Sequence, residues 1–213
     1  MKIKKNNFGE WFKVSRIIHD TTLKKRRPTL IVFFRPDKYM KSLASIGVES
    51  LAQLGFKWVI INTNLKNKKN PRIKQLKAWI KEAHEHGLKI LVLTNRPKRL
   101  IEKNLKLLDL EYDQYLSGVV KPFIIKRKKL FKIVGNLEQV YMICNDFLVD
   151  VPTANTLRIE NTVIEDNFLY ERLIDRKVAN YQKNIVIYFL KRNNMFNELQ
   201  TFEVNASISN EFL

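Results

Sequence analysis

Four groups of polar residues, each following a short apolar run, are the part of this sequence that could do chemistry. They are Asn62 with Asn64, Thr94 with Asn95, Lys121 alone, and Asp146 with Asp150. The two aspartates lie four positions apart at an expected strand-to-helix turn, so both can face one cavity if that turn is helical. Carboxylates suit hard cations, so the pair indicates a metal or phosphate pocket. The alternative is an ordinary acidic charge at a helix N-terminus, where the helix dipole favours it.

The apolar runs before these groups predict the buried strands of a parallel sheet. Residues 56–61, 89–93 and 140–144 are rich in β-branched and aromatic side chains, and residues 162–165 resemble a last strand. Helical spacing lies between the strands, with Pro71 and Pro97 as helix starts and Gly87 as a stop. This alternation predicts an α/β fold with helices on both faces of the sheet. Polar residues at the carboxyl ends of such strands converge at one edge.

Three segments are expected along the chain. Residues 1–28 form a basic N-terminal arm, residues 29–168 the α/β domain, and residues 169–213 a C-terminal helical extension with an acidic tail. Leu30–Phe34 precedes Pro36 and reads as an edge strand or a packed extended arm. Apolar residues among charges in 181–192 would suit a helix in a membrane interface, but packing against the sheet is the favoured interpretation.

The charge points to a polyanionic partner. Lys and Arg number 39 against 21 Asp and Glu, which gives a net charge of +18. One basic cluster comprises Lys24, Lys25, Arg26 and Arg27, and a second comprises Lys126, Arg127, Lys128 and Lys129. A single lysine run is typical of a solvated face, but several such runs favour polyanion binding. We expect RNA or the ribosome as the first partner and an anionic membrane surface as the second, with salt-dependent affinity. The acidic tail could serve a protein complex.

Cysteine and hydropathy bear on the compartment. The one cysteine, Cys144, ends a predicted strand and is expected to be a core thiol in a reducing compartment. The apolar runs are too short to span a bilayer, and no secretory signal pattern is found. We therefore expect a protein of the cytoplasm or an organelle matrix, with peripheral membrane association left open. His84 and His86 are expected on the surface and not as ligands.

The order of the polar groups resembles that of the haloacid dehalogenase (HAD) superfamily, and more specifically the YqeG family of bacterial type IIIA phosphatases. Relatives of that family include mitochondrial phosphatidylglycerophosphate phosphatases. The resemblance spans about residues 30–168 and depends on the order and spacing of several short matches. They are Arg35-Pro36-Asp37-Lys38-Tyr39, Ser42, Ile46, Leu54–Lys57, Trp79, His86–Lys89, Leu91–Asn95, Lys121-Pro122 and Asn145–Val151.

The resemblance implies a Rossmann-like three-layer sandwich and assigns a role to each polar group. Asn62 and Asn64 stand where the family has its nucleophilic aspartate and its acid/base aspartate. Thr94 and Lys121 stand where the phosphoryl group is bonded and neutralised. Taken alone, Thr94 could equally be a helix cap, and Lys121 an exposed lysine. Asp146 and Asp150 match the acidic pair that holds Mg²⁺.

The two asparagines predict a phosphatase fold that has lost its covalent chemistry. A carboxamide is neutral and a poor nucleophile, and it has no proton to exchange near pH 7. We expect magnesium binding to be weakened rather than lost, because Asn62 offers only an uncharged oxygen. The resulting hypothesis is a pseudoenzyme that binds a polyanion. The alternative is an active Mg²⁺-dependent phosphatase acting on a phosphorylated small molecule or a phosphatidylglycerophosphate-like lipid.

Overall fold

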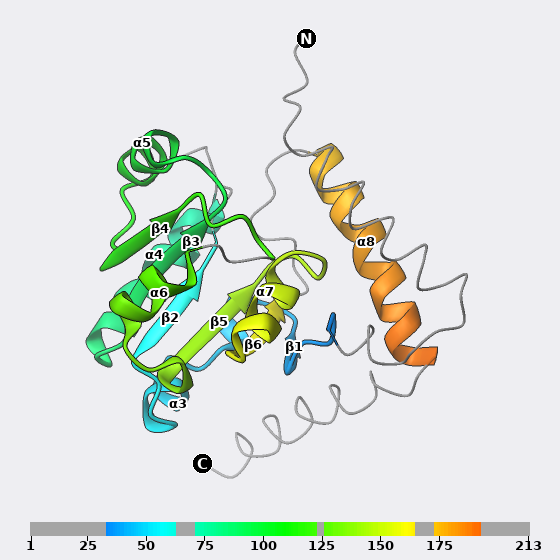
Figure 1. Ribbon diagram of the computed structural model, residues 1–213, viewed down its shortest axis with the longest axis horizontal. Helices are drawn as coiled ribbons and strands as arrows, with labels where there is room; N and C mark the ends of the chain where they lie inside the picture. Colours follow the sequence, from blue (N-terminus) through cyan, green and yellow to red (C-terminus); the bar gives the residue numbers. More distant parts are fainter. Residues whose placement is uncertain (1–32, 63–70, 123–125, 165–172, 193–213) are drawn as a thin grey trace.

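The computed structural model describes residues 33–62, 71–122, 126–164 and 173–192, and its centre is one parallel sheet (Figure 1). The strands in these residues are β1 (Lys38–Met40), β2 (Trp58–Ile61), β3 (Lys89–Thr94), β4 (Gln114–Ser117), β5 (Val140–Cys144) and β6 (Glu160–Ile164). Their order is β1-β6-β5-β2-β3-β4, and every neighbouring pair is parallel. The predicted α/β class and the central position of residues 56–61 between the other two strands are confirmed.

The central strands are continuous apolar runs because both faces of the sheet are covered. Trp58 is in register with Lys89 on one side and with Val140 on the other, so the three strands end at nearly the same level. All residues of β2 and β5 are buried. Val59 and Ile61 of β2 contribute to the core on one face, and Trp58 and Ile60 contribute to the core on the other.

Helices form the two outer layers, which confirms the expected three-layer sandwich. One face is covered by α3 (Val48–Gln53), α4 (Pro71–Glu85) and α5 (Lys98–Leu108). The other is covered by α6 (Arg127–Val134), α7 (Asp150–Leu157) and α8 (Leu173–Arg192). In Figure 1, α6 and α7 lie in front of the sheet and α4 lies behind it. Short 3₁₀ turns occupy η1 (Leu43–Ser45) and η2 (Leu137–Gln139).

Local sequence signals explain the bounds of α4. Pro71 is its first residue, as predicted, because the missing N–H of proline is no loss in a first helical turn. The chain leaves the helix through Gly87, whose φ of +77° lies in the left-handed region that glycine adopts without steric cost. Trp79 fixes α4 against the preceding segment, because its indole N–H donates to the carbonyl of Ile46 at 3.1 Å.

The two edges of the sheet differ from expectation. β4 was not predicted, because an edge strand with the sequence Gln-Tyr-Leu-Ser carries no apolar run. The prediction of a strand or an extended arm at Leu30–Phe34 is wrong for its described part: Phe33 and Phe34 lie in a turn, and the edge strand is β1, further along the chain. Phe34 packs against the core instead, and the Asn155 side chain donates to the Phe33 carbonyl at 2.8 Å.

The C-terminal helix is both a core element and an exposed one. Val186 and Leu190 are buried in the same cluster as β5, which agrees with the favoured interpretation of packing on the sheet. Tyr181 and Tyr188 remain 63% and 59% exposed on the helix surface. Within the described part of the chain, no helix combines the length and hydrophobicity that a bilayer crossing requires.

Candidate functional site

Three central strands bring polar residues together at the carboxyl edge of the sheet. Asn62 follows β2, Thr94 is the last residue of β3, and Asn145 follows β5. The strands are parallel and in register, so these residues lie at one level. Asn64 belongs to residues 63–70, which lie outside the described residues.

Asp150 is the centre of the site, and protein groups occupy both of its oxygens. The Lys121 ammonium contacts Asp150 Oδ1 at 2.8 Å, and the two side chains are 2% and 0% exposed. The backbone N–H of Asn145 donates to Asp150 Oδ2 at 3.2 Å. The Asn62 amide nitrogen approaches both oxygens, at 3.4 and 3.5 Å. A buried carboxylate needs such partners, because desolvation without them costs several kcal/mol.

Lys121 reaches this position because its loop is held in place at both ends. The Asn95 side-chain oxygen accepts from the Lys121 backbone N–H at 2.7 Å. The backbone of Gly118 donates to the Arg96 carbonyl at 2.9 Å. Between them Val120 has a φ of +56°, a conformation that strains a β-branched residue. The alternative of an exposed Lys121 is therefore wrong: the side chain is buried and paired.

Asp146 plays a different part from Asp150. Its Oδ1 accepts from the backbone N–H groups of Leu148 at 2.7 Å and of Val149 at 3.1 Å, in the turn that leads into α7. This is the behaviour expected of an acidic residue near a helix N-terminus. The turn is helical, as required, because the Asp150 N–H donates to the Asp146 carbonyl at 3.0 Å. The two aspartates thus share one turn, but the contacts of Asp150 tie it to Lys121 and those of Asp146 to the backbone.

Thr94 serves the loop after β3. Its side chain is buried, and its Oγ1 accepts from the Arg96 backbone N–H at 3.2 Å. The contact lies in the loop before α5, whose N-cap is Pro97 and receives no side-chain cap bond, so Thr94 is not the cap of that helix. The contact leaves Thr94 at the edge where the resemblance requires it.

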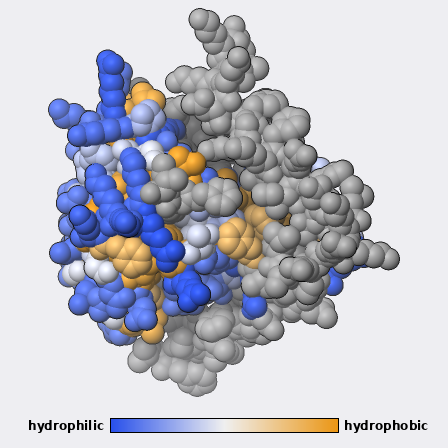
Figure 2. All heavy atoms as spheres, viewed as in Figure 1, coloured by the Kyte–Doolittle hydropathy of each residue, from blue (hydrophilic) through white to orange (hydrophobic). Residues whose placement is uncertain are grey.

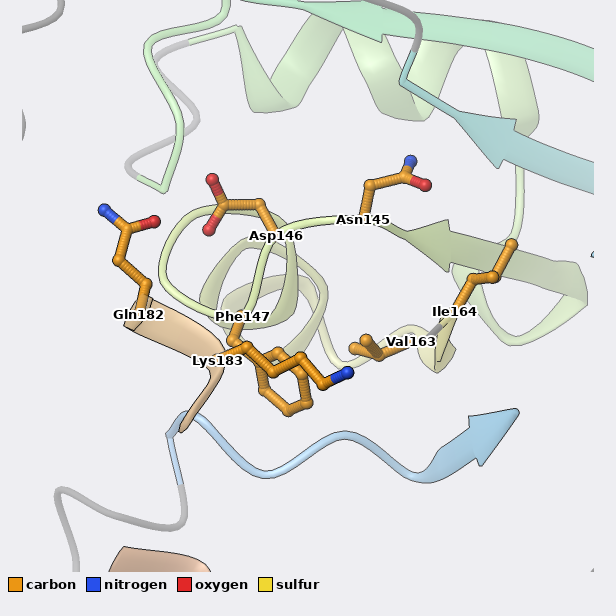
Figure 3. Close-up of a pocket in the computed structure, with 7 residues that line it drawn as sticks. All are labelled: Asn145, Asp146, Phe147, Val163, Ile164, Gln182 and Lys183. Atoms are coloured by element: carbon orange, nitrogen blue, oxygen red, sulfur yellow. The ribbon is translucent and has the colours of Figure 1, made fainter. Parts of the chain in front are cut away.

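Helix α8 closes one side of the site. The side chains of Asn145 and Asp146 point to one side of the loop after β5, and Phe147 points the other way, beside Lys183 of α8 (Figure 3). Gln182 and Lys183 complete a cavity of about 10 Å³, enough for one water molecule. The Asn145 side-chain oxygen is buried and has no hydrogen-bond partner among the described residues. α8 therefore narrows access to the acidic turn.

Sequence reasoning missed Asn95 and the α8 residues as parts of the site. Asn95 was visible as a second polar residue at the end of β3, but its bond to the Lys121 backbone depends on a loop 26 positions away. No local pattern marks Gln182 or Lys183, because their place follows from the packing of α8.

The predicted basic clusters are only partly described. Lys24, Lys25, Arg26 and Arg27 lie outside the described residues. Arg127, Lys128 and Lys129 are exposed on α6, as expected of a binding surface. Lys126 differs from these three residues, because it is half-buried and its ammonium donates to the Ser117 carbonyl at 2.6 Å. It anchors the end of β4 to the start of α6, and its part in binding stays a prediction.

The expectations for cysteine and histidine hold in part. Cys144 is fully buried, and burial raises the pKa of its thiol well above the ordinary value, so it is a core residue. His86 is exposed, whereas His84 is half-buried beside the Asp113 carboxylate, with 3.0 Å between Nε2 and Oδ2. Asp113 also accepts from the Ile90 N–H at 2.7 Å, so this contact is structural.

The site residues fit magnesium poorly. Mg²⁺ requires several oxygen ligands in octahedral geometry. Asp150 is already committed to an ammonium group, an amide and a backbone N–H, and Asn62 presents its NH₂ group to the same carboxylate. Among the described residues, no group of three or more His, Cys, Asp or Glu side chains is arranged to hold a metal ion. In this arrangement hydrogen-bond donors occupy both oxygens of Asp150.

Comparison with known proteins supports the resemblance. No protein-family model matches the chain. The chain is 24% identical to the probable phosphatase YqeG of Bacillus subtilis over 170 residues, which are 71% of this chain and 92% of that protein. A solved structure, 3-deoxy-D-manno-octulosonate 8-phosphate phosphatase from Moraxella catarrhalis with magnesium ion, phosphate ion and KDO, matches at 14% identity. That match has a TM-score of 0.36 and covers 73% of this chain and 97% of the other. The similarity to YqeG confirms the resemblance to HAD-type phosphatases.

Proposed function

We propose that this protein is a HAD-phosphatase-like pseudoenzyme that has lost covalent phosphoryl transfer and binds a polyanion, with RNA or the ribosome as the first partner. The observation that supports the loss of phosphoryl transfer is the contact of the Asn62 amide with Asp150. Asn62 stands at the end of β2, where the resemblance places the nucleophile. There it completes the partners of a buried carboxylate.

The chemistry of Asn62 explains the loss. Nucleophilic catalysis of this type needs an ionised carboxylate that attacks phosphorus. The amide nitrogen of asparagine is a donor with no nucleophilic lone pair, and its oxygen carries no charge. Positioning groups that remain after the loss of a nucleophile retain only a small fraction of the rate. Lys121 provides no electrostatic stabilisation to an incoming phosphate while Asp150 neutralises its charge.

The distribution of charged side chains supports the proposed binding of a polyanion. The one buried lysine among the described residues is paired with an aspartate, whereas Arg127, Lys128 and Lys129 project into solvent. Each phosphate that such a side chain neutralises releases condensed counterions, so affinity rises with the number of contacts and falls steeply with salt. RNA is the cellular polyanion that offers many phosphates in a row.

A second candidate is the active Mg²⁺-dependent phosphatase, acting on a phosphorylated small molecule or a phosphatidylglycerophosphate-like lipid. One observation favours it: Thr94, Lys121, Asp146 and Asp150 still meet at one edge of the sheet. In this case Mg²⁺ would be held by Asp146 and Asp150, with Lys121 released toward the phosphate.

An assay of aryl phosphate hydrolysis in millimolar Mg²⁺ separates the two candidates. We expect wild type to show no more turnover than Asp146→Ala. The double variant Asn62→Asp/Asn64→Asp tests whether carboxylates alone restore activity, and Asn136→Asp, the same change at an exposed position, is its control. Turnover by wild type that requires Mg²⁺ and disappears in Asp146→Ala would establish the enzyme and refute the pseudoenzyme.

A further inference from the structure

We infer that the outer face of α6 is a binding surface for single-stranded RNA, on which Phe131 and Arg127 stack against bases. The inference rests on the proposed polyanion-binding function and names the surface and the form of the partner. Three features of α6 carry it: its cations, its exposed aromatic ring, and the burial of its remaining apolar side.

The cationic side chains of α6 lie at positions where they do not stabilise the helix. Arg127, Lys128, Lys129 and Lys132 are exposed, and the first turn contains no acidic residue. Three of the four lie in that first turn, where the helix dipole disfavours positive charge. The helix therefore gives up stability to present these charges. A partner that brings negative charge recovers this loss.

The aromatic ring of Phe131 lies among these cations. It is 39% exposed, and the Arg127 guanidinium carbon is 5.6 Å from the ring centroid. Figure 2 shows small patches of hydrophobic atoms bordered by hydrophilic side chains on this face of the molecule. Both a phenyl ring and a guanidinium plane stack on nucleobases, and such stacking tolerates any base. Cations beside a stacking ring are the combination that binds single strands.

The remaining apolar residues of α6 make a membrane partner unsuitable. Leu130 and Val134 are 0% and 7% exposed and belong to the core under the helix. Binding in a membrane interface requires an apolar face that enters the lipid, and Phe131 alone does not form one. Double-stranded RNA is also a poor fit, because its bases are stacked on each other and offer no free face.

Helix α5 provides a second cationic surface, without an aromatic ring, for comparison. It exposes Lys98, Arg99, Lys103 and Lys106, with the aliphatic Leu100 exposed to 44%. α5 has as many exposed cations as α6 and no aromatic side chain, but it also exposes Leu107 and carries Glu102, whose carboxylate lies 3.7 Å from the Lys98 ammonium. Comparison of Phe131→Ala with Leu100→Ala isolates the ring, because each change removes an exposed apolar side chain and neither alters the charge.

The test is titration of the full-length protein with fluorescent RNA at one ionic strength. The probes are a short single-stranded oligoadenylate, an RNA duplex of equal length, and vesicles with and without anionic lipid. The variants are Phe131→Ala, Phe131→Tyr, which keeps a ring, and Leu100→Ala on α5. Circular dichroism checks that each variant is folded.

We expect Phe131→Ala to weaken oligoadenylate binding about fivefold or more, because one stacked base is lost. Phe131→Tyr and Leu100→Ala should bind oligoadenylate with the affinity of wild type. The RNA duplex should bind wild type and all three variants with the same affinity. Equal binding by Phe131→Ala and wild type would overturn the stacking surface while leaving polyanion binding intact. Tighter binding to anionic vesicles than to RNA, or no RNA binding by wild type, would overturn the RNA partner, and absence of binding to every anionic probe would refute the polyanion function itself.

Discussion

The protein holds charge in two contrasting ways, at the carboxyl edge of the sheet and on α6. At the sheet edge Lys121 and Asp150 are almost completely buried and lie 2.8 Å apart, and each is further fixed by asparagines. On α6 the charges are exposed, all of one sign within the helix, and gathered at the end that the helix dipole disfavours.

The contrast between the two regions indicates which charges need a binding partner from outside the protein. A buried ion pair must be complete within the protein, because desolvated charges without partners are costly. The charges of such a pair neutralise each other and do not need a ligand from outside the protein. Exposed cations cost little to keep, but their mutual repulsion is relieved only by anions from outside. Under the proposed function, the edge of the sheet serves the fold and the outer helix serves recognition.

Breaking the buried pair should have the largest effect. Asp150→Ala leaves the Lys121 ammonium buried without its counter-charge, which costs about 3–5 kcal/mol of unfolding free energy. The double variant Asp150→Ala/Lys121→Met removes both charges and should recover most of this loss. Urea unfolding measures both. A loss below about 1 kcal/mol in the single variant would mean that Lys121 reaches solvent and that the edge is not closed.

Reversing the charge of α6 should affect binding without loss of stability. The triple change Arg127→Glu, Lys128→Glu and Lys129→Glu is expected to weaken RNA binding about 100-fold and to flatten its salt dependence. The same change should raise the melting temperature at low salt, because glutamates suit a first helical turn. Fluorescence titration across salt and thermal unfolding measure the two effects.

The matched control for this prediction is reversal of Lys98, Arg99 and Lys103 on α5, which should weaken RNA binding less. Lys121→Met should leave RNA binding of the folded protein unchanged. If Lys121→Met abolishes binding and the α6 variant does not, the old pocket still recognises a phosphorylated ligand, and the contrast between the two regions is wrong.

Relieving the strain at Val120 should have the smallest effect. Glycine adopts a φ of +56° freely, so Val120→Gly should stabilise the protein by about 1 kcal/mol, after the entropy cost of glycine is subtracted. Thermal unfolding measures the change. Val119→Gly, at the buried neighbouring residue, is the control and should destabilise the protein. Destabilisation by Val120→Gly would show that the loop of Lys121 is held without strain.

The centre of the fold could be predicted from the sequence, and its edges could not. Buried parallel strands such as β2 and β5 are apolar on both faces and stand out as runs. The edge strands β1 and β4 each pair with one neighbour and are partly exposed, so their sequences carry no such signal. A correct centre was enough to place Asn62, Thr94 and Asp146 with Asp150 at one edge, whereas the place of Lys121, which follows the unpredicted β4, came from the resemblance.

The roles of the site residues could be predicted less well than their places. A lysine before proline reads equally as exposed or buried, and only the contact with Asp150 settles the matter for Lys121. Two aspartates four positions apart suggest a shared ligand, but backbone N–H groups of the turn engage Asp146, whereas the Lys121 ammonium and the Asn145 backbone N–H engage Asp150. Lys126 had no local signal of its bond to Ser117, because that bond joins a helix start to an unpredicted strand.

The most direct measurement is the effect of Mg²⁺ on the thermal stability of wild type and Asn62→Asp. A carboxylate at residue 62 would face Asp150 across about the same 3.4 Å, so we expect Asn62→Asp to be destabilised in EDTA and to gain at least about 3 °C in millimolar Mg²⁺. Wild type and the control Asn136→Asp should not respond to the ion. A clear rise in the melting temperature of wild type with Mg²⁺, absent in Asp150→Asn, would show that the edge still binds the metal and would contradict the loss of phosphatase chemistry.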